Sequence, residues 1–180
     1  MPMPEKYQLR EVFSAEVIAK RVRELATEID AAYARLGAEE ILLVGILKGA
    51  CVFYTDLLRA LKTPALVDFM QVSSYVGRES SGELTIHKDL VRDIAGKHVL
   101  VVEDIVDTGL TLSLLLKNLQ ERQPASLKLC TALDKAAARR YPLEPDFVGF
   151  GAEERFWVGY GLDYNEYFRG LPYIGELILE

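Results

Sequence analysis

Three stretches of the chain place apolar residues at the spacing of an α-helix, with polar residues between them. In the first, Val17, Val22 and Ile29 follow this spacing after Ser14, a candidate N-cap, and Gly37 ends the pattern. The three patterns predict amphipathic helices over residues 17–33, 50–62 and 110–122.

Short apolar runs without helical spacing alternate with these helices. Ile41–Ile46 and His98–Val102 are apolar on both alternating faces and rich in β-branched residues, a pattern typical of buried strands in parallel sheets. Further extended segments are predicted over residues 65–72, 126–133, 146–150 and 156–159. Strands that alternate with helices predict an α/β fold with a central, mainly parallel sheet flanked by helices.

Residues 73–89 interrupt this alternation. They are polar, rich in Ser and Gly, and lack an apolar period until Leu84. A long polar loop within a compact chain is usually a lid or a disordered tip. We therefore expect a loop over about 73–89.

Composition narrows the class of protein. The chain has 180 residues, and 21 Lys and Arg against 27 Asp and Glu give a net charge of −6. We expect one domain over residues 1–180, without general affinity for nucleic acid or membranes. The longest apolar run, Ile41–Ile46, is far shorter than the about 20 residues of a membrane span, and the N-terminus lacks the apolar stretch of a secretory signal. These features favour a cytoplasmic protein.

Candidate chemistry gathers where the second buried strand passes into the third helix. The turn Asp107–Thr111 would place backbone N–H groups at a helix N-terminus, Gly109 lets the backbone approach a ligand, and two threonines add hydroxyl donors, which suits a phosphate group. Glu103 and Asp104, at the strand end, suit sugar hydroxyls or a hard divalent cation. The plainer alternative is a solvated strand end with Asp107 as a helix cap. Spacing alone leaves both interpretations open.

The same residues carry a resemblance to a known family. Val101–Thr111 resembles the phosphoribosyl diphosphate signature of the type I phosphoribosyltransferases, in the form found in hypoxanthine-guanine phosphoribosyltransferases. Four other segments resemble the diphosphate loop, the start of the mobile lid and the purine-site region of that family, in the same order: Gly45–Ala50, Ser74–Tyr75, Pro145–Phe150 and Val158–Arg169. The resemblance covers about residues 40–175.

This resemblance implies a fold, a reaction and partners. The type I phosphoribosyltransferase fold adds a small hood, formed here by residues of about 150–180 with part of the N-terminal segment. The family transfers a phosphoribosyl group from phosphoribosyl diphosphate to a 6-oxopurine, with Mg²⁺, and its members form homodimers or homotetramers. Ser74 and Tyr75 would belong to a lid that closes over the reacting sugar and excludes water.

The resemblance also assigns roles within the signature. Asp107 would accept the proton from N7 of the purine while N9 attacks the sugar. A carboxylate at a helix N-terminus is stabilised as an anion, so its base strength would come from its position. The 5′-phosphate would be held by Thr108, Gly109, Leu110 and Thr111. Leu110 stands where many relatives have a polar or basic residue.

The diphosphate and the metal ion would be held by residues from three segments. Lys48 and Gly49 resemble the diphosphate-binding pair, which follows a non-proline cis peptide in the family, and Arg169 resembles the diphosphate-contacting arginine. Without the resemblance, Lys48 would be read as a solvent-exposed strand end. Glu103 and Asp104 would face the ribose hydroxyls and a magnesium ion, with the division between these two ligands left open.

The base would be read by residues near the C-terminus and after the strand at 126–133. Lys135 resembles the lysine that donates to the 6-oxo group of the purine, and Phe156 the ring that stacks on it, although core packing is the plainer role for Phe156. Trp157 stands where the family more often has Val or Ile, which leaves the preference among hypoxanthine, guanine and xanthine open. Asp163 resembles the residue beside the base that orders a second magnesium ion through water.

Three functional hypotheses follow. The first is purine salvage with hypoxanthine or guanine as acceptor. The second keeps the donor site but prefers xanthine, adenine or a pyrimidine. The third is a regulator that senses phosphoribosyl diphosphate and binds nucleic acid; it predicts a basic face or a helix-turn-helix, and neither is evident in this short acidic chain.

Overall fold

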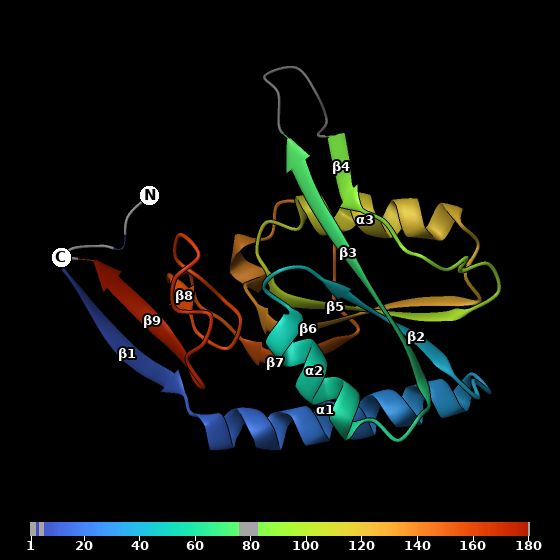
Figure 1. Ribbon diagram of the computed structural model, residues 1–180, viewed down its shortest axis with the longest axis horizontal. Coiled ribbons are helices and arrows are strands. Elements are labelled where there is room, and N and C mark those ends of the chain that lie inside the picture. The colour runs from blue at the N-terminus through green and yellow to red at the C-terminus, as the bar shows by residue number, and fades with distance from the viewer. Residues whose placement is uncertain (1–2, 4–5, 76–82, 180) are drawn as a thin grey trace.

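The computed structural model describes residues 3, 6–75 and 83–179, which form two β-sheets and three α-helices (Figure 1). In chain order the elements are β1 (Tyr7–Phe13), α1 (Ala15–Arg35), β2 (Ile41–Ile46), α2 (Cys51–Ala60), β3 (Ala65–Tyr75), β4 (Glu83–Lys88), β5 (His98–Val106), α3 (Leu110–Glu121), β6 (Ser126–Asp134), a short 3₁₀ helix (Ala136–Ala138), β7 (Phe147–Gly151), β8 (Trp157–Val158) and β9 (Ile174–Leu179). No helix in these residues is long and apolar enough to cross a membrane.

The larger sheet has six strands in the order β4-β3-β2-β5-β6-β7. The pairs β2–β3, β2–β5, β5–β6 and β6–β7 are parallel, and only β3–β4 is antiparallel. This confirms the predicted α/β fold with a mainly parallel central sheet. The predicted helices are confirmed with small changes at their ends.

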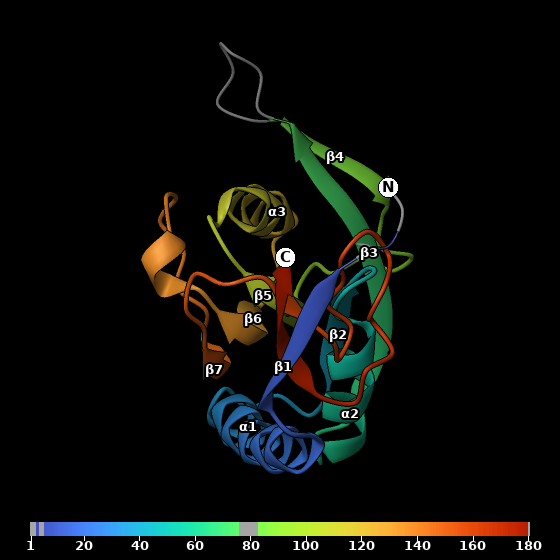
Figure 2. The ribbon, with the colours of Figure 1, turned by 90° about the vertical axis from the view of Figure 1, so that its left-hand side faces the viewer.

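Alternate residues of the central strands pack against helices on opposite faces of the sheet. In β2, Ile41 and Leu43 belong to the apolar cluster that contains α1 and α2, whereas Leu42 and Val44 belong to the cluster with α3. Figure 2 shows α3 on one side of the sheet and the other two helices on the opposite side. Burial on both faces explains why this strand is apolar throughout.

Helix α1 begins as the sequence predicts. The side chain of Ser14 accepts a hydrogen bond from the backbone N–H of Val17 (3.4 Å), and Gly37 follows the helix with a left-handed backbone (φ 69°). Val17 itself is 48% exposed, so the apolar stripe runs instead through Ile18 and its helical neighbours. The sequence pattern was wrong at this one position, because the buried face starts one residue later.

The smaller sheet joins the two ends of the chain. Strand β9 pairs antiparallel with β1, with Tyr7 opposite Leu179, and on its other side with β8. Figure 1 shows this sheet at one end of the molecule, beside the carboxyl ends of the larger sheet's strands. It agrees with the expected small hood, although β1 and β9 themselves were not predicted from the sequence.

The expected loop over residues 73–89 is largely a β-hairpin. β3 continues to Tyr75, and β4 returns antiparallel to it, with Ser73 opposite Thr85. The prediction of a loop was wrong for these parts because Leu84 and Ile86 alternate with exposed polar residues, a period of two that is short and easily missed. Residues 76–82 of the expected lid lie outside the described residues.

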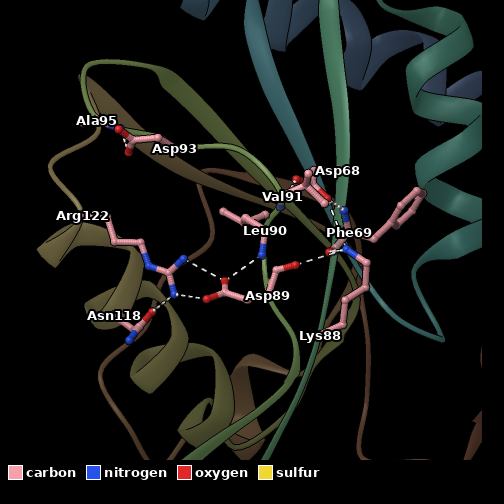
Figure 3. Close-up of polar contacts among 10 residues, drawn as sticks. All are labelled: Asp68, Phe69, Lys88, Asp89, Leu90, Val91, Asp93, Ala95, Asn118 and Arg122. Atoms are coloured by element: carbon pink, nitrogen blue, oxygen red, sulfur yellow. Dashed lines mark hydrogen bonds and ion pairs between the residues drawn. The ribbon is translucent and has the colours of Figure 1, made fainter.

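A polar network anchors the base of this hairpin (Figure 3). The buried carboxylate of Asp68 on β3 accepts hydrogen bonds from the backbone N–H of Val91 (2.8 Å) and from Lys88 Nζ (3.3 Å). Burial by itself would raise the pKa of Asp68, but backbone donors and Lys88 lower it below its ordinary value. Arg122, at the end of α3, pairs through both terminal nitrogens with Asp89 (2.8 and 3.0 Å). The end of β4 is therefore tied to both β3 and α3.

Candidate active site

Two adjoining cavities open beyond the carboxyl ends of the parallel strands. The first, about 320 Å³, lies between the end of β2, β5 and the start of α3; the second, about 240 Å³, reaches the end of β6 and the start of β8. They share Asp104, Ile105, Asp107 and Asp163. Open α/β sheets commonly bind ligands at this edge.

Most of the predicted site residues line these two cavities. The first is lined by Gly49, Glu103, Asp104, Asp107, Thr108, Gly109, Leu110, Thr111, Asp163 and Arg169. The second is lined by Asp104, Asp107, Lys135, Phe156, Trp157 and Asp163. Lys48 and Ser74 line neither of them. The fold thus brings together residues from five separate parts of the chain.

The turn before α3 has the geometry of an anion cradle. Gly109 is the N-cap of α3 with φ 87°, a left-handed conformation that glycine adopts without strain. No side chain caps this helix end, so its first N–H groups can face the cavity. Leu110 is 7% exposed, so its apolar side chain is buried and the backbone provides the polar groups at this position.

Glu103 and Asp104 lie within β5, which corrects the predicted end of this strand at Val102. Strand β5 continues to Val106 because β6 offers backbone partners along its whole length, up to Val106 opposite Asp134. Burial, and then the charge of Asp104, raise the pKa of Glu103 well above its ordinary value. Two adjacent carboxyl groups of this kind fit a cation.

Gly49 is required where the loop after β2 meets β5. A Cβ at this position would lie 1.7 Å from Asp104 Oδ2, so the absence of a side chain lets that carboxylate lie against the loop. The peptide bond between Leu47 and Lys48 is cis, as the resemblance implied. The loop therefore presents its backbone directly to the acidic residues of the cavity.

Lys48 and Arg169 both contact a carboxylate that sequence reasoning did not single out. Glu166 Oε2 lies 3.0 Å from Lys48 Nζ, and Glu166 Oε1 lies 3.4 Å from Arg169 Nη2. Lys48 first, and then the charge of Arg169, lower the pKa of Glu166. Arg169 also pairs with Asp163 (2.8 Å) and donates to the carbonyl of Gly161 (2.7 Å). The one signal of Glu166 in the sequence is its place three residues before Arg169, within the segment Val158–Arg169 that carries the resemblance.

A basic and an acidic side chain meet where the two cavities join. Lys135 Nζ lies 3.5 Å from Asp107 Oδ2, and the lysine side chain is 13% exposed whereas the aspartate is 54% exposed. Asp107 is thus open to a ligand. Lys135 is placed by the backbone, since its N–H donates to the carbonyl of Val106 (2.9 Å).

The two aromatic residues of the second cavity differ in exposure. The Phe156 ring is 48% exposed and meets Tyr164 edge to face, with ring centres 5.3 Å apart. Trp157 is buried; its indole N–H donates to the carbonyl of Glu153 (3.0 Å), and its ring stacks near Phe13. The large Trp157 side chain, which stands where the family more often has Val or Ile, therefore packs into the core between the hood and the larger sheet. Arg155, which the sequence reasoning missed, also lines this cavity.

Of the expected lid residues, Ser74 lies beside the start of α3. Ser74 Oγ and Thr111 Oγ1 are 2.7 Å apart, so a hydroxyl pair links the end of β3 to the start of α3. Tyr75 ends β3. Their role as a lid stays a prediction.

Comparisons with known proteins agree with this geometry. The model of the phosphoribosyl transferase domain family matches residues 8–165. The chain is 50% identical to a hypoxanthine-guanine phosphoribosyltransferase of Mycobacterium avium over 92% of this chain and 84% of that protein. It is 47% identical to a hypoxanthine-guanine-xanthine phosphoribosyltransferase of Tritrichomonas foetus, over 93% and 91%. A crystal structure of a Bacillus anthracis hypoxanthine-guanine phosphoribosyltransferase matches 96% of this chain and 100% of its own, at 37% identity and a TM-score of 0.88. The chain therefore belongs to the type I phosphoribosyltransferase family.

Proposed function

We propose that the chain transfers the 5-phosphoribosyl group of phosphoribosyl diphosphate to hypoxanthine or guanine, which yields IMP or GMP and diphosphate. The observation that carries this proposal is the pairing of Asp107 with Lys135 where the two cavities join. One cavity presents an anion cradle and acidic residues, as a phosphorylated sugar requires. The other presents an exposed ring and a cation, as a 6-oxopurine requires.

In this reaction the purine would lie in the second cavity. The ammonium of Lys135 would donate to the 6-oxo group, and the exposed Phe156 ring would stack on the base. Trp157 would contribute its backbone carbonyl, because its ring is buried in the core. N9 of the purine forms a bond to C1 of the sugar while the C1–O bond to diphosphate breaks, and diphosphate leaves with the electron pair. The proton on N7 passes to Asp107.

The sugar donor would lie in the first cavity. The turn Thr108–Thr111 would hold the 5′-phosphate through backbone N–H groups and two hydroxyls. The diphosphate would lie along Gly49 toward Lys48 and Arg169. Its oxygens would then replace Glu166 as partner of Lys48. Both side chains of that ion pair are exposed, and such pairs contribute only about 0–1 kcal/mol, so the exchange costs little.

The acidic residues fit a magnesium ion. Glu103 and Asp104 line the first cavity side by side, and neither has a basic partner among the described residues. The residues that the structure describes contain no group of three His, Cys, Asp or Glu side chains that could hold a metal ion without other ligands. That suits Mg²⁺, which is usually bound by one or two carboxylates together with substrate phosphates. A bound ion would neutralise charge on the departing diphosphate. Asp163 would hold a second magnesium ion through water.

The acceptor base tests the proposal. With phosphoribosyl diphosphate and Mg²⁺, the purified protein is expected to convert hypoxanthine and guanine to their nucleotides, which chromatography of the products measures. A chelator is expected to abolish the reaction. The rate with xanthine shows how far the range of accepted 6-oxopurines extends. Adenine carries an amino group where Lys135 needs an oxygen, so adenine as the best acceptor would contradict the assignment of Lys135. Loss of activity with all four purines would contradict the proposed function.

A substitution at Gly49 tests the proposed role of the first cavity. Gly49→Ala is expected to raise the KM for phosphoribosyl diphosphate and lower kcat by roughly tenfold or more, because the new Cβ displaces the Asp104 carboxylate. The displaced atoms end a side chain, so the fold should be retained. Steady-state kinetics at several Mg²⁺ concentrations measure the effect; wild-type kinetics in this variant would mean that the position of Asp104 is unimportant.

The assembly and the location of the protein remain part of the proposal. By its family we expect a homodimer or homotetramer in the cytoplasm, with small-molecule substrates and neither nucleic acid nor membrane as partner. Light scattering of the purified protein measures its oligomeric state. A nucleic-acid-binding regulator, the alternative from another class, would instead bind DNA at physiological salt in a gel-shift assay.

A further inference from the structure

An arginine that the reaction scheme does not use lies directly behind the phosphate cradle. Arg139 follows the short 3₁₀ helix after β6, and its side chain is only 14% exposed. Its guanidinium donates to the backbone carbonyl of Asp107, to the carboxylate of Asp134 and, through Nε, to the carbonyl of Leu143 (3.1 Å). One side chain thus joins the turn before α3 to the end of β6 and to the segment that follows it.

The surrounding backbone strengthens this attachment. The N–H groups of Arg140 and Tyr141 donate to the carbonyl of Thr108 (3.0 and 3.1 Å). A Cβ at Gly109 would meet Arg139 Cδ at 3.0 Å, so the stem of the arginine lies against the turn. The carbonyls of two consecutive cradle residues are therefore held from behind, which turns the peptide N–H groups that follow toward the cavity.

The carboxylate partner of Arg139 directly precedes Lys135 in the chain. Asp134 is 15% exposed and pairs with the guanidinium, and the next residue is Lys135, whose Nζ faces Asp107. A planar guanidinium suits this place because its separate nitrogens bond acceptors that lie apart, whereas an ammonium has all its donors on one nitrogen at the end of a flexible stem. Removing one partner of a buried pair leaves the other charge uncompensated.

We propose that Arg139 is a positioning residue for the reaction: it fixes the Asp107–Gly109 turn against Asp134 and thereby sets the place of the Asp107 carboxylate relative to Lys135. This rests on the proposed function of Asp107. Arg139 lines neither cavity. Its effect passes through the backbone of the turn.

Two substitutions of Arg139 separate its charge from its geometry. Arg139→Gln is expected to lower kcat by about 10- to 100-fold, the range found when a residue that supports a catalytic group is removed, with the KM for the purine changed less than about threefold. Arg139→Lys keeps a cation for Asp134 and should recover most of the thermal stability that Arg139→Gln loses. Its donors all lie on one nitrogen and cannot replace the separate contacts of Nη1, Nη2 and Nε, so the turn is held less firmly and kcat stays low. Arg140→Gln is the matched control, because the neighbouring side chain is exposed, and its kcat should equal that of the wild type.

A double-mutant cycle distinguishes positioning from general destabilisation. In an Asp107→Asn background there is no carboxylate to position, so Arg139→Gln should lower kcat by much less than it does in the wild type. An equal loss in both backgrounds, or an unchanged kcat in Arg139→Gln, would overturn the proposal while leaving the proposed function intact.

Hydrogen exchange gives a readout that does not depend on activity. The amides of residues 108–111 should exchange faster in Arg139→Gln than in Arg140→Gln, while those in the middle of α3 stay the same. Should the wild type act on no purine, the proposed function fails and this measurement still decides whether Arg139 holds the turn. Equal exchange in the two variants would show that it does not.

Discussion

Asp107→Asn is expected to lower kcat by about 100-fold or more while leaving the protein folded. The amide matches the carboxylate in shape but cannot accept the proton from N7, and general base catalysis contributes about 10²–10⁴-fold to a rate. The side chain is 54% exposed and its ion pair is with Lys135 at 3.5 Å, so little of the fold depends on its charge. Steady-state kinetics with hypoxanthine and a thermal melt measure the two quantities.

A carboxylate far from the cavities provides the control for this variant. Asp93 accepts a hydrogen bond from the backbone N–H of Ala95 (3.0 Å) in the loop before β5, so Asp93→Asn makes the same chemical change outside the site. It should keep the wild-type kcat. If Asp107→Asn did the same, the proton acceptor would have to be another residue of the site.

Gly161→Ala is expected to damage stability and activity together. Gly161 has φ 102°, and its Cβ would lie 2.0 Å from the backbone carbonyl oxygen of Gly49. The left-handed backbone alone costs about 1–2 kcal/mol in alanine, and the overlap with a main-chain atom adds to it because neither backbone can yield easily. The melting temperature should fall by roughly 5 °C or more, since 1 kcal/mol corresponds to about 2–4 °C in a chain of this size.

The activity of the same variant should fall because Gly161 lies against the loop that contains Gly49. Its carbonyl accepts a hydrogen bond from Arg169 Nη1 (2.7 Å), so a shift of this residue moves Arg169 as well as Gly49. Gly151→Ala is the matched control: a Cβ there meets no atom within 4 Å. A Gly161→Ala protein with the melting temperature and kcat of the control would mean that the close approach of the two loops is not needed.

The local parts of the fold and of the site could be predicted from sequence because their causes are local. Helix α1 follows from apolar spacing and the Ser14 cap, and β2 follows from a run that is apolar on both faces. The turn Asp107–Thr111 could be recognised because a glycine with a left-handed backbone and two hydroxyls stand at fixed places before a helix. The resemblance of these segments then gave the family.

The tertiary structure decided the features that depend on residues far apart in the chain. β1 exists as a strand because β9 pairs with it, and β5 continues through Glu103 and Asp104 because β6 lies alongside. The contacts of Glu166 with Lys48 and of Arg139 with Asp107 likewise join separate segments. Such partners leave no periodicity in the sequence, since a hydrogen bond or an ion pair depends on where two backbones meet in space. The sequence by itself therefore determined most helices and strands and the main chemical groups of the site, and tertiary packing decided how these groups are oriented relative to one another.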